Sequence, residues 1–370
     1  MINYSIAISG VKMKKIIING MEIFGDKEPH GPQRYGIEVV RGLDQVCKKG
    51  EIEILIPNSI IKNTDKYRWN NININAIEYD MSKYKARFRF SKFYFAKYVK
   101  KNDAVGVDLV LSYPINGCNY ISVFDCITKE NKEGYKNFKD FLFCKKFLAF
   151  EHIAIKNAEK IFTISNISKQ ALIKDYNVKK PIIIAPAAWQ HMLEKKLDNS
   201  ILEKYGLKSK TYLFSAGVGL KRKNFKWIQE AAFQNPDFTF VISGANRNDD
   251  FFREKGKPDN LIQTGFVSDE EYVSLLSNAR AYIQPSLYEG FGIPPLEALG
   301  CGTEIIISDI PIFKEIYEDS AHYINPYQYD NINIKQIIQS EVCNPQKVLE
   351  KYSWVKTAEI IYKEIMGDIT

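Results

Sequence analysis

Residues 286–297 read Ser-Leu-Tyr-Glu-Gly-Phe-Gly-Ile-Pro-Pro-Leu-Glu, a glycine-containing stretch between an expected strand and an expected helix. An apolar run typical of a strand ends near Gln284, and a helix is predicted to begin at Pro294. The two glycines between them let the backbone approach a ligand closely, and free N–H groups at the helix start favour an anion. Glu289 and Glu297 would then face one ligand, with Glu297 able to accept hydrogen bonds from a vicinal diol. The alternative is a glycine turn beside two solvated glutamates, and the short glycine pattern alone does not exclude it.

Around this stretch, short apolar runs alternate with helical patterns in two successive series. The expected strands of the first series are Ile16–Ile18, Ile52–Ile56, Asp108–Ser112, Tyr120–Phe124, Lys160–Ile164 and Ile182–Ala185. Those of the second are Tyr212–Ala216, Phe238–Ser243, Leu261–Thr264, Ala281–Gln284, Glu304–Ser308 and Ala321–Ile324. Expected helices include Tyr35–Cys47, Phe138–Ala158, Phe225–Phe233, Asp269–Ala279, Pro294–Leu299 and Ile312–Tyr317.

This alternation predicts an α/β protein with two doubly wound, Rossmann-like domains, because short apolar strands separated by helices form parallel sheets covered on both faces. Ligands of such sheets bind beyond the carboxyl ends of the strands, so the cleft between the domains is the expected site. Local signals support two helix starts in the second domain. Ser268 to Glu271 form a capping box, and Asn224 is predicted to cap the helix that begins at Phe225.

Composition excludes several classes of protein. The chain has 370 residues, of which 45% are hydrophobic and 26% charged, so two domains can each bury a core. Its six cysteines form no C-x-x-C pair and no cluster with histidine, which favours reduced thiols in the cytosol over a zinc site or disulfide framework. No run is long enough for a membrane-spanning helix. The net charge of +7 suits anionic partners such as phosphates.

A second candidate site is basic. Residues 217–224 read Gly-Val-Gly-Leu-Lys-Arg-Lys-Asn and lie between an expected strand and an expected helix. Arg222 and Lys223 beside a helix N-terminus would form a diphosphate site. The alternative is a basic surface loop, which is the more common meaning of three successive cations.

Taken together, these motifs resemble the retaining group 1, or family four, glycosyltransferases, which have a GT-B fold. The matching text covers residues 264–271, 285–292, 296–298, 301–303 and 308–311, and Glu289 and Glu297 match the Glu-x7-Glu motif of that family. The resemblance implies that Glu289 contacts the donor sugar, that Glu297 holds the ribose, and that Arg222 and Lys223 neutralise the leaving diphosphate. It adds further donor-binding candidates in the glycine loops and after an expected strand: Gly31, Phe266, Val267, Gly290, Phe291, Gly292 and Ile293. The implied domains are 1–188 for the acceptor, 189–345 for the donor, and 346–370 as a helix that crosses back to the first domain.

The chain departs from the family pattern at Phe124-Asp125, where many relatives have His-Asp. Asp125 is kept as a catalytic candidate. Since a phenyl ring cannot hydrogen-bond a 6-hydroxyl but can pack on a methyl group, Phe124 favours a 6-deoxy donor sugar. Phe124 could equally be a core residue at a strand end.

The resemblance implies a retaining hexosyltransferase. It would move a hexose or deoxyhexose from a nucleotide-diphosphate sugar to a glycan or lipid-linked oligosaccharide, in cell-surface polysaccharide synthesis. We expect no cofactor and no metal, because protein cations would stabilise the leaving diphosphate. One rival is a non-catalytic partner subunit that binds nucleotide sugars; another is a different GT-B enzyme, such as an epimerase or a phosphorylase.

Residues 83–101 interleave cations with aromatic side chains. Such a segment could contact acidic lipids at the inner face of the membrane, and nucleic acid is a weaker alternative. A helix whose aromatic side chains pack inward, with solvated lysines outside, explains the same pattern.

Overall fold

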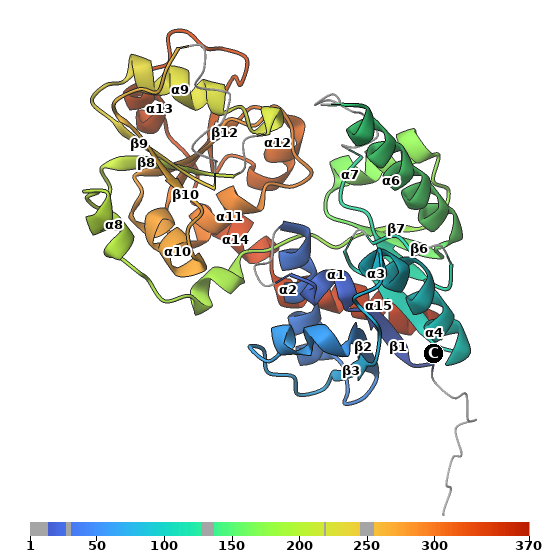
Figure 1. Cartoon of the computed structure of the whole chain (residues 1–370). Helices are drawn as coiled ribbons and strands as arrows, with labels where there is room; N and C mark the ends of the chain where they lie inside the picture. Colours follow the sequence, from blue (N-terminus) through green and yellow to red (C-terminus); the bar gives the residue numbers. More distant parts are fainter. Residues whose placement is uncertain are drawn as a thin grey trace, which may run out of the picture.

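The computed structural model describes residues 14–26, 31–110, 112–114, 116–126, 137–217, 220–244 and 255–369. Two α/β domains face each other, each with helices on both sides of a parallel sheet (Figure 1). The strands of the first domain are β1 (Ile16–Asn19), β2 (Ile52–Pro57), β3 (Asn73–Ile77), β4 (Val105–Asp108), β5 (Tyr120–Ser122), β6 (Lys160–Thr163) and β7 (Ile182–Ile184). Those of the second are β8 (Tyr212–Ala216), β9 (Thr239–Ser243), β10 (Leu261–Gly265), β11 (Ala281–Gln284), β12 (Glu304–Ser308) and β13 (His322–Ile324).

The helices that matter for the site follow particular strands. In the first domain they are α1 (Met21–Phe24), α2 (Gly31–Val46), α3 (Ala86–Arg89), the π-helix η2 (Phe90–Tyr94), α4 (Phe95–Lys101), α6 (Phe138–Asn157) and α7 (Asn166–Tyr176). The linker contains the 3₁₀ helix η3 (Gln190–Glu194) and α8 (Ser200–Lys204). The second domain has η4 (Lys221–Lys223), α9 (Phe225–Gln234), α10 (Asp269–Asn278), α11 (Ile293–Gly300), α12 (Pro311–Tyr317) and α13 (Ile334–Gln339), followed by α14 (Gln346–Lys351) and α15 (Trp354–Ile369).

Both sheets are doubly wound, as predicted. The strand order is β3-β2-β1-β4-β5-β6-β7 in the first and β10-β9-β8-β11-β12-β13 in the second, and all the described pairs are parallel. The order reverses between β1 and β4, and again between β8 and β11. Loops that leave a sheet at such a reversal point part from each other and form a crevice where ligands bind. The loops after β8 and β11 carry the basic cluster and the glycine stretch, so the topology brings both motifs together.

The sequence expectations fail at three places. Leu109, Val110 and Ser112 do not extend β4. The Asp108 carboxylate accepts from the Val110 N–H at 3.1 Å and from the Ser112 hydroxyl, which turns the chain out of the sheet. The edge strand β3 was not expected, since its half-exposed residues include two asparagines. Asn224 does not cap α9 through its side chain. It adopts a left-handed conformation with φ of 55°, and its amide instead donates to the carbonyls of Pro285 and Pro326.

The last helix lies on the first domain, although it follows the second in sequence (Figure 1). Helix α15 packs closely against α2, where Gly42 leaves room for Ala358 and for the backbone of Trp354. The Thr357 hydroxyl donates to the Pro186 carbonyl at 2.7 Å. This helix therefore ties the linker to the first domain.

Polar contacts join the two domains on both sides of the space between them. Arg34 of α2 pairs with Asp269 of α10 at 2.8 Å. The Glu315 carboxylate of α12 accepts from the backbone N–H groups of Asn166 and Ile167 at 2.6 and 2.9 Å. Since these N–H groups open α7, Glu315 caps a helix of the opposite domain.

Candidate functional site

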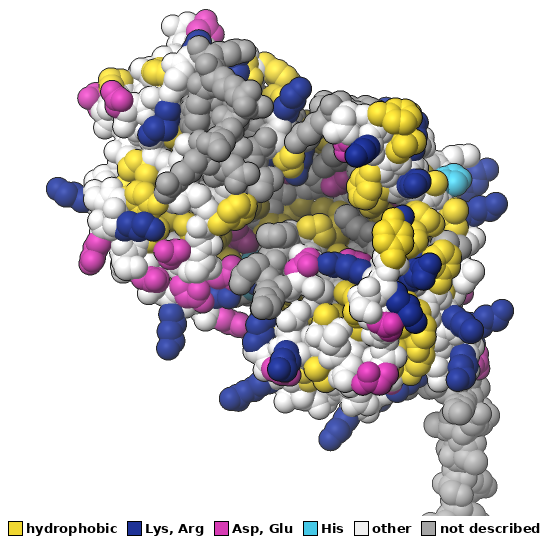
Figure 2. Space-filling model, viewed as in Figure 1, with side chains coloured by type: hydrophobic (Ala, Val, Ile, Leu, Met, Phe, Trp, Pro, Cys, Tyr) yellow, Lys and Arg dark blue, Asp and Glu magenta, His cyan; other side chains and the backbone are white. Residues whose placement is uncertain are grey.

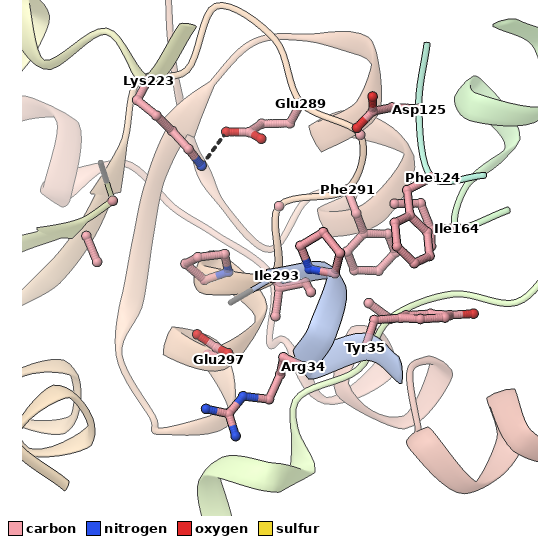
Figure 3. A pocket seen from close by; sticks show the side chains of 18 of the residues that line it. Arg34, Tyr35, Phe124, Asp125, Ile164, Lys223, Glu289, Phe291, Ile293 and Glu297 are labelled. Carbon is pink, nitrogen blue, oxygen red and sulfur yellow. Dashed lines mark ion pairs between the residues drawn. The ribbon is translucent and has the colours of Figure 1, made fainter. Parts of the chain in front are cut away.

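A cavity of about 590 Å³ lies between the domains, at the reversal point of the second sheet. Its floor is formed by the loops after β8 and β11 and by the start of α11, and its opposite wall by α2 and the loops after β5 and β6. Figure 3 shows Lys223, Glu289 and Glu297 on one side and Tyr35, Phe124 and Asp125 on the other. The cavity has the size of a small-molecule site.

Two cations of the basic cluster meet one carboxylate in this cavity. Arg222 Nη1 lies 2.6 Å from Glu289 Oε2. Lys223 Nζ lies 2.8 Å from Glu289 Oε1, as Figure 3 shows. Burial alone would raise the pKa of Glu289, but Lys223 and Arg222 outweigh it, so its pKa is lowered and the carboxylate is ionised. Ser286 adds a hydroxyl donor at 2.7 Å. The group of two cations and one carboxylate carries a net positive charge, which suits a phosphate ligand.

The two loops are also joined through their backbones. The Leu287 N–H donates to the Arg222 carbonyl at 2.8 Å. Together with the Asn224 amide, this bond fixes the basic cluster against the glycine stretch. The cations are therefore positioned before any ligand binds.

The glycine stretch presents a row of backbone donors. Within the part of the chain that the structure describes, the N–H groups of residues 290–293 make no hydrogen bond to protein. Gly292 has φ of 92°, a conformation that favours glycine, and a Cβ there would lie 2.5 Å from Phe313. Pro294 and Pro295 lack N–H groups, so the donors at the start of α11 are those of Gly290 to Ile293. Such a row of N–H groups at a helix start binds anionic or hydroxyl oxygens.

Glu297 lies one turn into α11, at the other end of the cavity from Glu289 (Figure 3). It is 7% exposed. Its Oε2 accepts from the Tyr272 hydroxyl at 2.8 Å, and its Oε1 lies 2.9 Å from His191 Nε2. Each carboxylate oxygen can accept a second hydrogen bond, so Glu297 remains able to bind a diol.

The first domain contributes an apolar wall and one carboxylate. Phe124, 6% exposed, packs edge-on against Tyr35 with ring centroids 4.8 Å apart, and Ile164 lines the same wall. Phe124 is therefore both a core residue and part of the cavity surface. Asp125 reaches Gly290, where a Cβ would lie 3.0 Å from its Oδ2. The absence of a side chain at Gly290 lets the two domains meet here.

Most of the predicted site residues come together in this cavity. Its lining includes Gly31, Asp125, Arg222, Lys223, Glu289, Gly290, Phe291, Gly292, Ile293 and Glu297. Phe266 and Val267 are not part of the lining; the Phe266 side chain is 69% exposed and Val267 packs against the core. Val218 and Gly219 lie outside the described residues.

Sequence reasoning missed three residues around Glu297. Arg34 was not singled out from the sequence, yet it lines the cavity near Glu297 (Figure 3). Burial alone would lower the pKa of Arg34, but Asp269 outweighs it and the pKa is raised, so the guanidinium stays charged. Tyr272 and His191 are separated from Glu297 by 25 and 106 residues. No local pattern relates them to it.

Among the described residues, no group of three or more His, Cys, Asp or Glu side chains is arranged to hold a metal ion. None of the helices that the structure describes is both long and apolar enough to cross a bilayer.

Comparison with known proteins shows which family the second domain resembles. Residues 198–350 match the family described as Glycosyl transferases group 1. Over these residues, which form most of the second domain, the chain is similar to the group 1 glycosyltransferases. Its structure resembles that of the glycosyltransferase WaaG, involved in lipopolysaccharide biosynthesis, with a TM-score of 0.59, 15% identity, and coverage of 96% of this chain and 99% of the other. It also resembles a sucrose-phosphate synthase from Thermosynechococcus elongatus, with a TM-score of 0.68, 13% identity and coverage of 96% and 100%. At these identities the likeness shows the GT-B fold.

Curated relatives are similar to this chain over part of their length. O-antigen chain mannosyltransferase B of Escherichia coli is 26% identical over 60% of this chain and 59% of its own. O-antigen chain mannosyltransferase RfbU of Salmonella typhimurium is 28% identical over 47% of this chain and 49% of its own. The chain thus spans about half the length of these relatives.

Proposed function

We propose that this glycosyltransferase transfers a hexosyl or 6-deoxyhexosyl group from a nucleotide-diphosphate sugar to a glycan hydroxyl, with retention at the anomeric carbon. The observation that carries this proposal is that Arg222 and Lys223 both pair with Glu289 at the cavity floor. Beside them lie the backbone N–H groups of residues 290–293, which make no hydrogen bond within the described part of the chain. These groups suit a diphosphate, and Glu297 suits the ribose attached to it. The sugar would then lie between Glu289 and the wall formed by Phe124 and Asp125.

In the proposed reaction, the bond between the anomeric carbon and the diphosphate oxygen breaks, and the acceptor hydroxyl attacks from the same face. Arg222, Lys223 and the N–H groups of residues 290–293 stabilise the negative charge that develops on the departing diphosphate. The acceptor proton passes to the diphosphate oxygen. The positive charge at this site is supplied by side chains, so the proposal includes no cofactor and no metal ion.

The names of the relatives suggest which polymer the proposed reaction would build. Both E. coli and Salmonella proteins are described as O-antigen chain mannosyltransferases. We accordingly assign this chain to the synthesis of a cell-surface polysaccharide, with mannose or its 6-deoxy counterpart as the first donors to examine. A lipid-linked oligosaccharide would be the acceptor, and the enzyme would act at the inner face of the membrane.

We also propose a peripheral membrane contact by the first domain, made by one part of the expected segment 83–101 together with the start of α6. Within residues 83–101, Phe90 and Phe95 are fully buried, so much of this segment packs inward. Phe93 remains 51% exposed, and the start of α6 adds Phe138 at 71% and Phe143 at 68%. The ring of Phe88 joins the two elements, because it contacts both Phe93 and Phe150.

Exposed lysines lie on the same helix as two of these rings. Lys139, Lys145 and Lys146 of α6 are all exposed, and hydrophobic and basic side chains alternate across this face of the domain (Figure 2). We call Phe93, Phe138, Phe143 and these three lysines the basic aromatic face. Its rings suit the boundary between headgroups and acyl chains, and its lysines suit acidic headgroups.

A thermal-shift panel tests the proposed function. A nucleoside diphosphate at 100 times its Kd stabilises the protein by about 2.7 kcal/mol, so GDP, UDP, ADP and dTDP can be compared directly. We expect one of them to raise the Tm, and Lys223→Ala to remove most of that rise. Lys221→Ala is the matched control, because Lys221 is exposed and lies outside the cavity. A panel without any shift, or an equal shift in the Lys223 variant, would contradict the assignment of the nucleotide site.

A further inference from the structure

Behind Glu297, away from the cavity, runs a short chain of buried side chains. His191 Nε2 lies 2.9 Å from Glu297 Oε1, and Trp354 Nε1 donates to His191 Nδ1 at 3.1 Å. His191 is 3% exposed and Trp354 is 5% exposed. Neither side chain is part of the cavity lining. Any effect of His191 on a ligand must therefore pass through Glu297.

The chemistry of the three groups fixes the tautomer of the histidine. An indole N–H can only donate, so His191 Nδ1 must be the acceptor in its bond with Trp354. A neutral imidazole then carries its proton on Nε2, which donates to Glu297 Oε1. Trp354 thus sets which nitrogen of His191 faces Glu297 with a proton.

The linker and the start of the C-terminal helix are joined by further hydrogen bonds beside this chain of contacts. His191 belongs to η3 of the linker, and Trp354 is the first residue of α15. The neighbouring Gln190 binds the same segment twice: its amide donates to the Tyr352 carbonyl at 2.8 Å, and its carbonyl accepts from the Trp354 N–H at 3.3 Å. Linker and C-terminal helix are therefore clamped together directly behind Glu297.

We propose that His191 is a positioning residue for nucleotide recognition, oriented by Trp354 and acting through Glu297. The donor from His191 occupies one accepting position of Oε1, and the Tyr272 hydroxyl occupies one of Oε2. Each oxygen keeps one further position, so the carboxylate accepts one hydrogen bond from each hydroxyl of a ribose 2′,3′-diol. Burial raises the pKa of Tyr272 well above its ordinary value, so its hydroxyl stays protonated and donating. This inference rests on the proposed function, in which Glu297 binds the ribose.

The test compares a ribonucleotide with an analogue that lacks one hydroxyl of the diol. Affinities of GDP and 2′-deoxy-GDP, or of UDP and 2′-deoxy-UDP, are measured by calorimetric titration for each variant. We expect the wild-type protein to prefer the ribonucleotide by roughly tenfold or more, because a lost hydroxyl leaves a buried carboxylate oxygen short of a donor. The ratio of the two affinities is the readout. A merely structural role of His191 would weaken both nucleotides equally and leave this ratio unchanged.

Three variants separate the possible outcomes. His191→Phe removes both ring nitrogens, and we expect it to lose most of the preference for ribose. His191→Gln should retain it, since an amide can accept from Trp354 and donate to Glu297. Trp354→Phe removes only the indole donor and should lower the ratio without abolishing it. If His191→Phe does not fold, Trp354→Phe carries the same test.

Glu297→Gln distinguishes failure of this inference from failure of the proposed function. An unchanged ribose preference in His191→Phe and Trp354→Phe, together with a loss of preference in Glu297→Gln, would overturn the role of His191 alone. An unchanged preference in Glu297→Gln would overturn the ribose site itself. A preference that falls in Glu297→Gln and His191→Phe, and is kept in His191→Gln, supports the inference.

Discussion

Arg222 and Glu289 form an ion pair of 2.6 Å across the two loops that leave the reversal point of the second sheet. The same carboxylate also pairs with Lys223, so both cations that would bind a diphosphate are held by one glutamate. A bound diphosphate must share these cations with Glu289. The pair keeps the cations in place, and it also lowers the affinity of the site for phosphate.

Replacing this glutamate should separate binding from turnover. In Glu289→Gln the amide cannot neutralise the two cations, so we expect GDP or UDP to bind up to about tenfold more tightly. Turnover should fall roughly 100-fold, because the variant loses a charge beside the donor sugar. Calorimetric titration and initial rates measure the two effects. Glu318→Gln is the control, since Glu318 forms an exposed ion pair with Lys351 in the same domain. Weaker nucleotide binding in Glu289→Gln would refute this role.

Turnover should survive chelation of divalent cations. In the proposed mechanism, Arg222 and Lys223 supply the positive charge that a metal ion supplies in other phosphate-transfer sites. We expect the initial rate in excess EDTA to equal the rate in buffer alone. Loss of activity in EDTA, followed by recovery in magnesium or manganese, would show that the side chains do not suffice.

The basic aromatic face should bind acidic vesicles. Each cation near such a surface contributes about 1 kcal/mol, and burial of each ring adds about 1.5–3 kcal/mol at most. We expect co-sedimentation with vesicles that contain phosphatidylglycerol, and little with phosphatidylcholine alone. Phe138→Ser combined with Phe143→Ser should reduce binding roughly tenfold or more. Tyr327→Ser is the matched control, because Tyr327 is 68% exposed on the other domain. Equal binding to both kinds of vesicle would exclude an acidic membrane as the partner.

Phe124 should favour a donor sugar without a 6-hydroxyl. Its ring lines the cavity wall and is held by Tyr35, so it offers a fixed apolar surface and no hydrogen bond. Burial of a methyl group against it contributes about 0.8 kcal/mol, which predicts a preference of roughly fourfold. Competition between GDP-mannose and GDP-rhamnose, which differ at carbon 6, measures it. A preference for GDP-mannose that persists in Phe124→Ala would exclude this role for the ring.

The strands that could be predicted from the sequence are those buried on both faces. Ile52–Ile56 and Glu304–Ser308 are nearly continuous apolar runs, and both form strands at those positions. The edge strand β3 was missed because its exposed side leaves no apolar run to recognise. Residues 109–112 were assigned to a strand because Leu109 and Val110 are apolar, yet these side chains are buried in the turn beyond β4.

The residues of the candidate site also fall into those that could be predicted from the sequence and those that could not. Two short motifs could be recognised as candidate sites from the spacing of their residues, and the fold brings both into one cavity. They contribute Glu289, Glu297, Arg222 and Lys223. Residues that support them from a distance carry no such signal. His191 and Trp354 are 163 residues apart, and only the return of α15 to the linker brings them together. Phe266 was predicted to bind the donor because its motif matches the family, and nothing in the sequence indicated that its side chain lies exposed outside the cavity lining.

Release of nucleoside diphosphate from nucleotide sugars is the measurement that tests whether this chain transfers sugar at the cavity between its domains. The purified chain is incubated with GDP-mannose, GDP-rhamnose and UDP-hexoses, with and without an O-antigen-type glycan acceptor. The GDP or UDP that is released is then measured. We predict release from at least one donor, faster with acceptor, reduced roughly 100-fold in Arg222→Ala and unchanged in Lys221→Ala. Binding of nucleotide without release from any donor would contradict catalysis and identify a non-catalytic subunit. Equal release by Arg222→Ala would place the chemistry outside this cavity.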